Sequence, residues 1–232
     1  MQPEHHHRDV KGGAARAAVF GVSDGLVSNV GLILGVAGAD ASAGVVRVAG
    51  LAGLVAGAVS MAFGEYNSMK VQAELLQREL DLERLEIRRN PAYETAELAA
   101  IYESRGLEAR SAREMAEAAM ADPDLALETH AREELGIDPA DLGSPWGAAR
   151  SSLVAFAVGA TVPLVPWFIG GGDAAIVAAL GLALVAAAVV GIVTARLTER
   201  PPVRMVGRQL AFTIVPAAIT YAIGSIVGVG VG

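Results

Sequence analysis

Carboxylate and thioether side chains recur at helical intervals along one stretch of the sequence. Met61, Glu65 and Met69 follow one another every four residues, at the end of a long apolar run. The stretch then continues without Pro or Gly as far as Pro91, which predicts a single helix with these side chains on one face. The chain contains no Cys. A metal bound here would therefore meet carboxylate, thioether, imidazole or backbone oxygen.

The polar continuation of this stretch is rich in glutamate at the same helical spacings. Like charges three or four residues apart disfavour an isolated helix, so they need a compensating cation or neighbouring arginines. One interpretation is a metal site built from carboxylates. The other is a solvated helix whose own arginines neutralise it. The glutamates concerned are Glu79, Glu83, Glu86, Glu94 and Glu97.

The composition indicates a polytopic membrane protein. Of the 232 residues 53% are hydrophobic, and the 19% that are charged gather in blocks. Five apolar runs reach the roughly 18 residues that mark a spanning helix, namely 14–39, 45–66, 146–169, 174–195 and 206–231. Pro163 and Pro166 should kink the third span. We therefore expect an all-α protein with five transmembrane helices in a lipid bilayer.

Residues 70–143 are too rich in Glu and Arg to cross a membrane and form an insert between the second and third spans. Turn signals stand at Asn90-Pro91, Arg105-Gly106 and Asp122-Pro123 and divide the insert into about four helices. These helices are expected to pack into a small helical domain. We therefore expect a cytoplasmic tail at 1–13 and transmembrane helices 1 and 2 at 14–69. A helical metal-binding domain follows at 70–143, and transmembrane helices 3 to 5 lie at 144–232.

Basic residues predict the orientation in the membrane. The tail, the insert and the loop before the last span carry nearly all the Lys and Arg, whereas the opposite loops, 40–44 and 170–173, carry none. By the positive-inside rule, the N-terminus and insert are cytoplasmic and the C-terminus is outside. The tail lacks a signal-peptide core, so we expect a prokaryotic plasma membrane. Its His5, His6 and His7 form either a metal-binding tract or a solvated terminus.

Asp24 is an acid in the interior of the first span. If the hydrocarbon begins near Ala17, a rise of about 1.5 Å per residue places Asp24 roughly 10 Å below the surface. Met61 reaches a similar depth when counted from the opposite side, so the two side chains can meet. An acid beside a thioether favours a transition metal over Mg²⁺ or Ca²⁺. The alternatives are that backbone amides satisfy Asp24 and that Met61 fills an apolar gap.

Several motifs taken together resemble the vacuolar iron transporter family, and specifically its bacterial-type members. They are His6-His7-Arg8-Asp9-Val10, Ser23-Asp24-Gly25-Leu26-Val27-Ser28, Ser60-Met61-Ala62-Phe63-Gly64-Glu65-Tyr66, Glu134-Leu135-Gly136, Pro163-Leu164-Val165-Pro166 and Thr220-Tyr221. The resemblance covers nearly the whole chain. It implies a five-span antiporter that moves divalent iron or manganese out of the cytosol against protons. It also implies a homodimer with the path between protomers, and a cytosolic helical domain that collects metal.

The resemblance also assigns roles to single residues. Asp24 and Met61 match the family's aspartate and methionine of the translocation pathway, and Glu65 falls at its cytoplasmic mouth. Met69 extends the same side of the helix, so we include it in the pathway.

In the metal-binding domain, the family's paired glutamates match Glu83 with Glu86 and Glu94 with Glu97. A later glutamate of the family matches Glu134. The chain departs from the family just before that last position. Where many relatives carry a methionine followed by a glutamate, it has His130 and Ala131. Imidazole can replace a thioether ligand, but Ala131 cannot replace a carboxylate. The number of metal sites in the insert therefore stays open.

The expected function is proton-coupled export of Fe²⁺ or Mn²⁺ from the cytosol, with Zn²⁺ and Co²⁺ as further candidate cargo and no prosthetic group. Burial favours the protonated form of a carboxylate, so protons can compete with metal at Asp24 and Glu65. The alternative is a membrane-bound metal sensor or scaffold without transport. The sequence disfavours an enzyme, because it has no Ser/His/Asp set, Cys nucleophile or phosphate-binding Gly loop. Its net charge of -7 disfavours a nucleic-acid partner.

Overall fold

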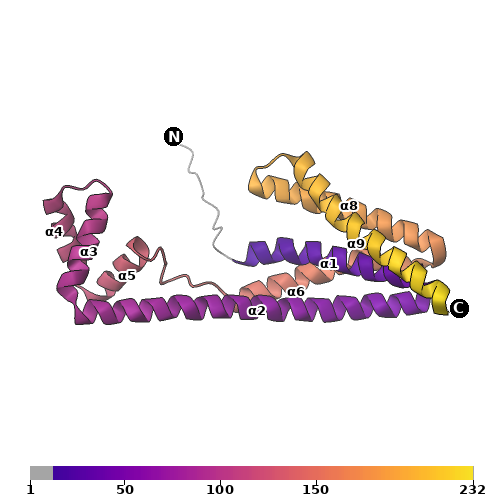
Figure 1. Ribbon diagram of the computed structural model, residues 1–232, viewed down its shortest axis with the longest axis horizontal. Helices are drawn as coiled ribbons and strands as arrows, with labels where there is room; N and C mark the ends of the chain where they lie inside the picture. Colours follow the sequence, from indigo (N-terminus) through magenta and orange to yellow (C-terminus); the bar gives the residue numbers. More distant parts are fainter. Residues whose placement is uncertain (1–12, 232) are drawn as a thin grey trace. The chain divides into compact units, whose positions relative to one another are not determined.

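The computed structural model describes residues 13–231, and every regular element among them is a helix (Figure 1). The predicted histidine tract at His5, His6 and His7 lies outside the described residues. The elements are α1 Gly13–Gly38, α2 Ala43–Arg89, α3 Pro91–Ser104, α4 Ala109–Met120, α5 Pro123–Glu133, α6 Pro145–Thr161, the 3₁₀ turn η1 Val162–Leu164, α7 Pro166–Ile169, α8 Gly172–Thr198 and α9 Pro202–Val231.

Five helical segments of the described chain are long and apolar enough to cross a membrane, namely Arg16–Gly38, Ala43–Arg89, Pro145–Leu164, Gly172–Thr198 and Pro202–Gly228. The predicted class, an all-α protein with five membrane-spanning helices, is thereby confirmed. Helix α2 has 47 residues, which at about 1.5 Å each far exceed the roughly 30 Å of a bilayer core. Only its first half is apolar enough to fit such a core, and its second half is rich in glutamate.

The described residues form two compact units, one made of 13–67 with 144–231 and the other of 68–143. We call them the membrane unit and the insert unit. Each has a hydrophobic core of its own. The predicted helix breaks at Asn90-Pro91, Arg105-Gly106 and Asp122-Pro123 are confirmed, since α3, α4 and α5 are separated there.

Small residues allow α1 to lie close to its neighbours in the membrane unit. A Cβ on Gly25 would overlap the backbone of Phe156 in α6, and a Cβ on Gly159 would overlap the backbone of Val22 in α1. Apolar side chains of α1 then pack on alanines of α8 and α9, with Leu26, Val30 and Leu34 in one buried cluster. Glycine-mediated approach of this kind is a common source of helix association in membranes.

The third span is interrupted where its prolines predict a kink. Helix α6 gives way to η1 at Val162, and the short α7 begins at Pro166. Pro163 and Pro166 cannot donate backbone hydrogen bonds, so a regular α-helix cannot continue through this segment. The Asn29 side chain of α1 donates to the carbonyl oxygen of Ala160 at 2.6 Å, next to this break.

The insert unit is a small helical core closed by local signals. Asp122 caps α5 by accepting hydrogen bonds from the backbone N–H groups of Asp124 and Leu125. Leu80 and Ile87 of α2 share a buried cluster with residues of α5. A second cluster joins α3 to α4 through Leu98, Tyr102, Ala112 and Ala116. The packing therefore holds one face of α2 against α5.

We predict that Gly25→Ala destabilises the membrane unit. The added methyl group meets backbone atoms of Phe156, which cannot move aside as a flexible side chain would. Overpacking of this kind costs about 1–3 kcal/mol, so the unfolding temperature in detergent should drop. Gly181→Ala is the matched control, because nothing lies within 4 Å of a Cβ at that position. Equal unfolding temperatures for the two variants would contradict the proposed close approach.

Candidate metal sites

A groove on the membrane unit has acidic and thioether side chains among its lining. Its volume is about 510 Å³, and its walls come from α1 and α2 with one aromatic ring from α6. Three of the four predicted pathway residues line it, which are Asp24, Met61 and Glu65. The full lining is Phe20, Asp24, Ser28, Asn29, Leu32, Gly53, Gly57, Ser60, Met61, Gly64, Glu65 and Phe156.

Small residues of α2 leave space for the groove. A Cβ on Gly53 would come within 2.9 Å of the Asn29 side-chain oxygen, and a Cβ on Gly57 would overlap the ring of Phe156. Gly64 has open space in front of it. Larger residues at these positions would fill the gap between the helices. The glycines therefore set both the closeness of α2 to α1 and the free volume between them.

The carboxylate of Asp24 has no counter-charge among the described residues. Its side chain is half-buried, and no donor or cation between residues 13 and 231 reaches its carboxylate oxygens. The nearby hydroxyl of Ser28 donates instead to the backbone carbonyl of Asp24. An acid placed in a membrane segment without a partner is a functional candidate, because its charge is otherwise unfavourable there.

Glu65 differs from Asp24 in having a cation beside it. Its side chain is 7% exposed, and its Oε2 lies 3.0 Å from Nη2 of Arg16 in the first turns of α1. The Arg16 side chain is 64% exposed. Arg16 is not among the site residues predicted from the sequence. No sequence signal pairs it with Glu65, because the two are far apart along the chain.

Asn29 is a second groove residue that the sequence reasoning missed. The side chain is buried, and its Nδ2 is held by the Ala160 carbonyl. This leaves Oδ1 buried without a hydrogen-bond partner among the described atoms. A lone amide inside an apolar span was the available signal, since buried polar groups in a membrane need a partner or a function.

Met69, the fourth predicted pathway residue, is placed in the insert unit. It is buried, and its Cε lies against the position that a Cβ of Gly143 would occupy. It does not line the groove. Its role in the pathway remains a prediction, while its observed contact is one of packing.

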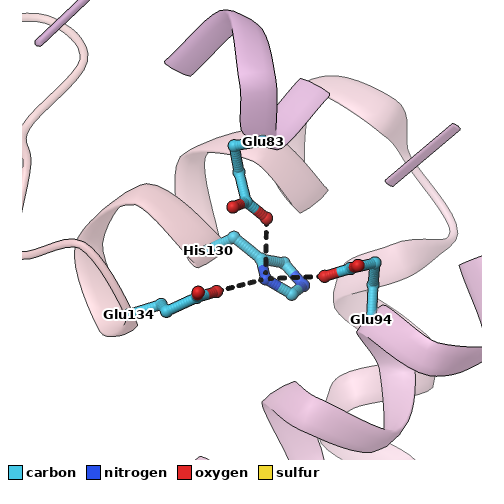
Figure 2. A group of neighbouring side chains, drawn as sticks. All are labelled: Glu83, Glu94, His130 and Glu134. Carbon is cyan, nitrogen blue, oxygen red and sulfur yellow. Dashed lines mark hydrogen bonds and ion pairs between the residues drawn. The ribbon is translucent and has the colours of Figure 1, made fainter. Parts of the chain in front are cut away.

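The insert unit brings together four of the seven predicted metal ligands (Figure 2). Glu83 comes from α2, Glu94 from the first turn of α3, and His130 and Glu134 from the end of α5. One ligand atom from each lies within 4.8 Å of the others. His130 Nδ1 is 3.1 Å from Glu83 Oε1, 3.3 Å from Glu134 Oε2 and 3.9 Å from Glu94 Oε2. We call these four residues the carboxylate–histidine cluster.

The cluster is buried and holds more acceptors than it can satisfy. His130 is fully buried, and Glu83 and Glu94 are nearly so. One ring nitrogen can donate to only one of the three carboxylates that surround it. Glu83 Oε1 lies within ion-pair distance of the ring without hydrogen-bond geometry, and the other ring nitrogen, Nε2, has no partner among the described atoms. A cation at the centre would satisfy these groups together.

The electrostatics of the cluster show the same excess of negative charge. Burial, the largest cause, and the negative charges of Glu134, Glu94, Glu86 and Glu97 together raise the pKa of Glu83 to about 7. Burial also raises the pKa of Glu94, as does Glu97, while His130 acts in the opposite direction. Without a metal, the site therefore retains protons near neutral pH, and a divalent cation would displace them.

The remaining predicted ligands of the insert lie outside the cluster. Glu79 and Glu86 are exposed and Glu97 is half-buried, and none of them belongs to the group within 4.8 Å. Glu86 and Glu97 act on the cluster through their charge. Ala131, which has no ligand atom to offer, is fully buried in the apolar core beside α2.

The donor set limits the ions that fit. Carboxylate oxygens with one imidazole nitrogen suit Fe²⁺, Mn²⁺ and Zn²⁺, whereas Ca²⁺ and Mg²⁺ favour oxygen alone. The groove offers a different set, with a thioether beside two carboxylates. The chain thus carries two candidate metal-binding regions of different softness, one in each unit.

Comparison with known proteins relates the chain to a single family. A sequence profile of the VIT family matches residues 15–225. Vacuolar iron transporter 1 of Oryza sativa subsp. japonica is 34% identical over 202 residues, which are 85% of this chain and 80% of the relative. Vacuolar iron transporter 1 of Eucalyptus grandis is 35% identical over 192 residues, which are 82% of this chain and 77% of the relative. The Arabidopsis thaliana protein of the same name is 30% identical over 226 residues, which are 96% of this chain and 90% of the relative.

We predict that Glu83→Gln has opposite effects on metal binding and on the metal-free fold. The neutral amide removes a buried charge that its neighbours repel, so the unfolding temperature of the chelator-treated protein should rise at pH 8. Loss of a ligand should weaken Mn²⁺ binding by about 10-fold or more. Thermal unfolding by circular dichroism and titration calorimetry measure the two effects. Glu103→Gln, an exposed helical glutamate outside the cluster, is the control and should change neither.

The raised pKa of Glu83 also predicts how stability depends on pH. Between its ordinary pKa of 4.5 and its folded-state value of about 7, the folded protein holds a proton that the unfolded chain has released. The free energy of unfolding of the metal-free protein should therefore fall as pH rises through this window, by at most on the order of 3 kcal/mol. Glu83→Gln should flatten the slope. An identical slope in the variant would show that Glu83 does not hold this proton.

Proposed function

Because the chain belongs to the VIT family, we propose that it exports a divalent transition metal from the cytosol in exchange for protons. Membership makes it an integral membrane transporter of metal ions and not an enzyme. Relatives named vacuolar iron transporters make Fe²⁺ the first candidate cargo, and Mn²⁺ has similar ligand preferences. Zn²⁺ and Co²⁺ are further candidates.

The observation that carries this proposal is the groove between two apolar helices. It contains an acid without a counter-charge, Asp24, together with the thioether-bearing Met61 and the buried Glu65. Hard oxygen and soft sulfur donors together favour Fe²⁺ over the more abundant Mg²⁺ and Ca²⁺. The unpartnered oxygen of Asn29 adds a neutral donor along the same wall. We infer that these groups form the path of the metal.

Proton coupling would follow from the same carboxylates. A carboxylate in a poorly solvated site binds either a proton or a metal ion, because both remove its unfavourable charge. Protons arriving from the far side would release metal from Asp24 and Glu65. Return of the protons to the cytosol would then restore the acids for the next ion.

In this proposal the carboxylate–histidine cluster collects cytosolic metal for the path. His130 supplies nitrogen where many relatives have sulfur, so the cluster should accept Zn²⁺ as well as Fe²⁺ and Mn²⁺. Glu79, Glu86 and Glu97 would add a negative field that concentrates cations nearby. We place the insert and the N-terminus in the cytoplasm of a prokaryotic cell and the C-terminus outside.

We propose a homodimer in which a second copy covers the groove. The groove of one copy is open on one side, with the exposed Phe20 and Leu32 at its border. A path through the membrane has to be screened from lipid, because an ion in contact with hydrocarbon is strongly disfavoured. A second protomer would provide that screen.

A metal sensor or scaffold is the second candidate function. It is favoured by the insert unit, which has its own core and a ligand cluster that could bind metal without any transport. Ion flux separates the two functions, because a sensor binds metal and moves none.

We predict that Asp24→Asn abolishes transport while the protein remains folded. The amide keeps the size of the side chain but cannot carry the charge that neutralises a divalent cation. Uptake of Fe²⁺ and Mn²⁺ into proteoliposomes with a pH gradient, followed together with proton movement, should fall to the level of empty liposomes. Asp173→Asn, at the exposed start of α8, should transport normally. Undiminished flux through Asp24→Asn would remove this residue from the mechanism.

A further inference from the structure

Glu65 is a buried acid that depends on one neighbouring cation. Its side chain is 7% exposed at the edge of the groove, and Arg16 Nη2 lies 3.0 Å from its Oε2. No other Lys, Arg or His of the described chain forms an ion pair with it. A buried carboxylate that loses its only cation becomes strongly unfavourable, so a positive charge or a proton has to take the vacated place.

Arg16 is much better able to leave than Glu65. Its side chain is 64% exposed, and it belongs to the first turn of α1, which begins at Gly13. A long arginine stem near a helix end can rotate into water, where the guanidinium is well solvated. Glu65 is fixed inside the long helix α2. The ion pair therefore joins an exposed cation to a buried acid.

The charges of the groove favour exchange over joint occupancy. In one copy, Asp24 and Glu65 contribute two negative charges and Arg16 offsets one of them. A divalent cation bound to Glu65 while Arg16 stayed at 3.0 Å would lie beside the guanidinium, and the two cations would repel each other. If Arg16 leaves, Glu65 remains paired with a cation and this repulsion is removed.

We propose that Arg16 is an exchangeable counter-cation of the metal path, which pairs with Glu65 in the empty groove and is displaced when a divalent cation binds. This inference rests on the proposed transport function and extends it to a residue outside the metal-ligand set. Competition from Arg16 lowers the affinity of the groove for metal, and the guanidinium pairs with Glu65 again once the proton that released the ion has left this carboxylate. The competing explanation is a permanent ion pair that only fastens α1 to α2.

Transport kinetics distinguish exchange from fastening. Mn²⁺ flux into proteoliposomes is measured for the wild type, Arg16→Gln, Glu65→Gln and the double variant. Exchange predicts that Arg16→Gln lowers the KM for Mn²⁺ by about 5-fold, the factor expected for a partly exposed ion pair. The same substitution should leave the KM unchanged in the Glu65→Gln background. Arg47→Gln is the control, because Arg47 bonds only the Ala43 carbonyl within the described chain and does not line the groove.

Two results would overturn the inference while leaving transport intact. One is an unchanged or raised KM in Arg16→Gln, and the other is an equal effect of this substitution with and without Glu65. A wild type that moves neither Mn²⁺ nor Fe²⁺ would instead refute the proposed function.

A second measurement uses the unmutated protein, so it does not depend on the variants folding. Phenylglyoxal modifies free guanidinium groups, and mass spectrometry quantifies its addition at each arginine. Exchange predicts that saturating Mn²⁺ increases labelling of Arg16 and leaves labelling of Arg47 unchanged. Labelling of Arg16 that stays constant or decreases with Mn²⁺ would refute displacement.

Discussion

Negative charge held in poorly solvated places is the constraint on which both candidate sites depend. In the membrane unit, the Asp24 carboxylate has no partner among the described residues and Glu65 has one exposed arginine. In the insert unit, three carboxylates surround one imidazole nitrogen. Folding alone does not reward these arrangements, because each leaves charge or hydrogen-bonding capacity unsatisfied. A protein that binds and releases cations has a use for this instability.

Close contact between helices makes the membrane site possible. Glycines let α1 approach α6 at Gly25 and Gly159, and Gly64 of α2 leaves open volume beside the groove. The same residue type therefore has two effects, since a missing side chain permits contact where a neighbouring backbone is near and leaves space where none is. The groove exists because close packing on one side of α1 is combined with a gap on the other.

The sequence predicted the elements well because they depend on local and periodic signals. Apolar runs identified the spans, and Pro91, Gly106 and Pro123 marked helix breaks that the structure contains. The sequence could not predict which glutamates meet, because Glu83, Glu94 and Glu134 come from separate helices whose packing is not encoded in spacing. The family resemblance identified these three glutamates as metal ligands, but it identified Glu86 and Glu97 as ligands too, and these two lie outside the cluster. Arg16 and Asn29 were missed for the same reason, since their partners are distant in sequence.

The histidine in the insert cluster has a consequence for chemical durability. Fe²⁺ reacts with peroxide, and oxidants of this kind convert methionine to its sulfoxide, which is a poorer metal ligand and a larger, polar group. His130 and the three carboxylates contain no sulfur, so this reaction has no target among the four cluster side chains. Met61 in the groove retains a thioether. Oxidation at sulfur would therefore alter a donor of the membrane path and none of the insert cluster.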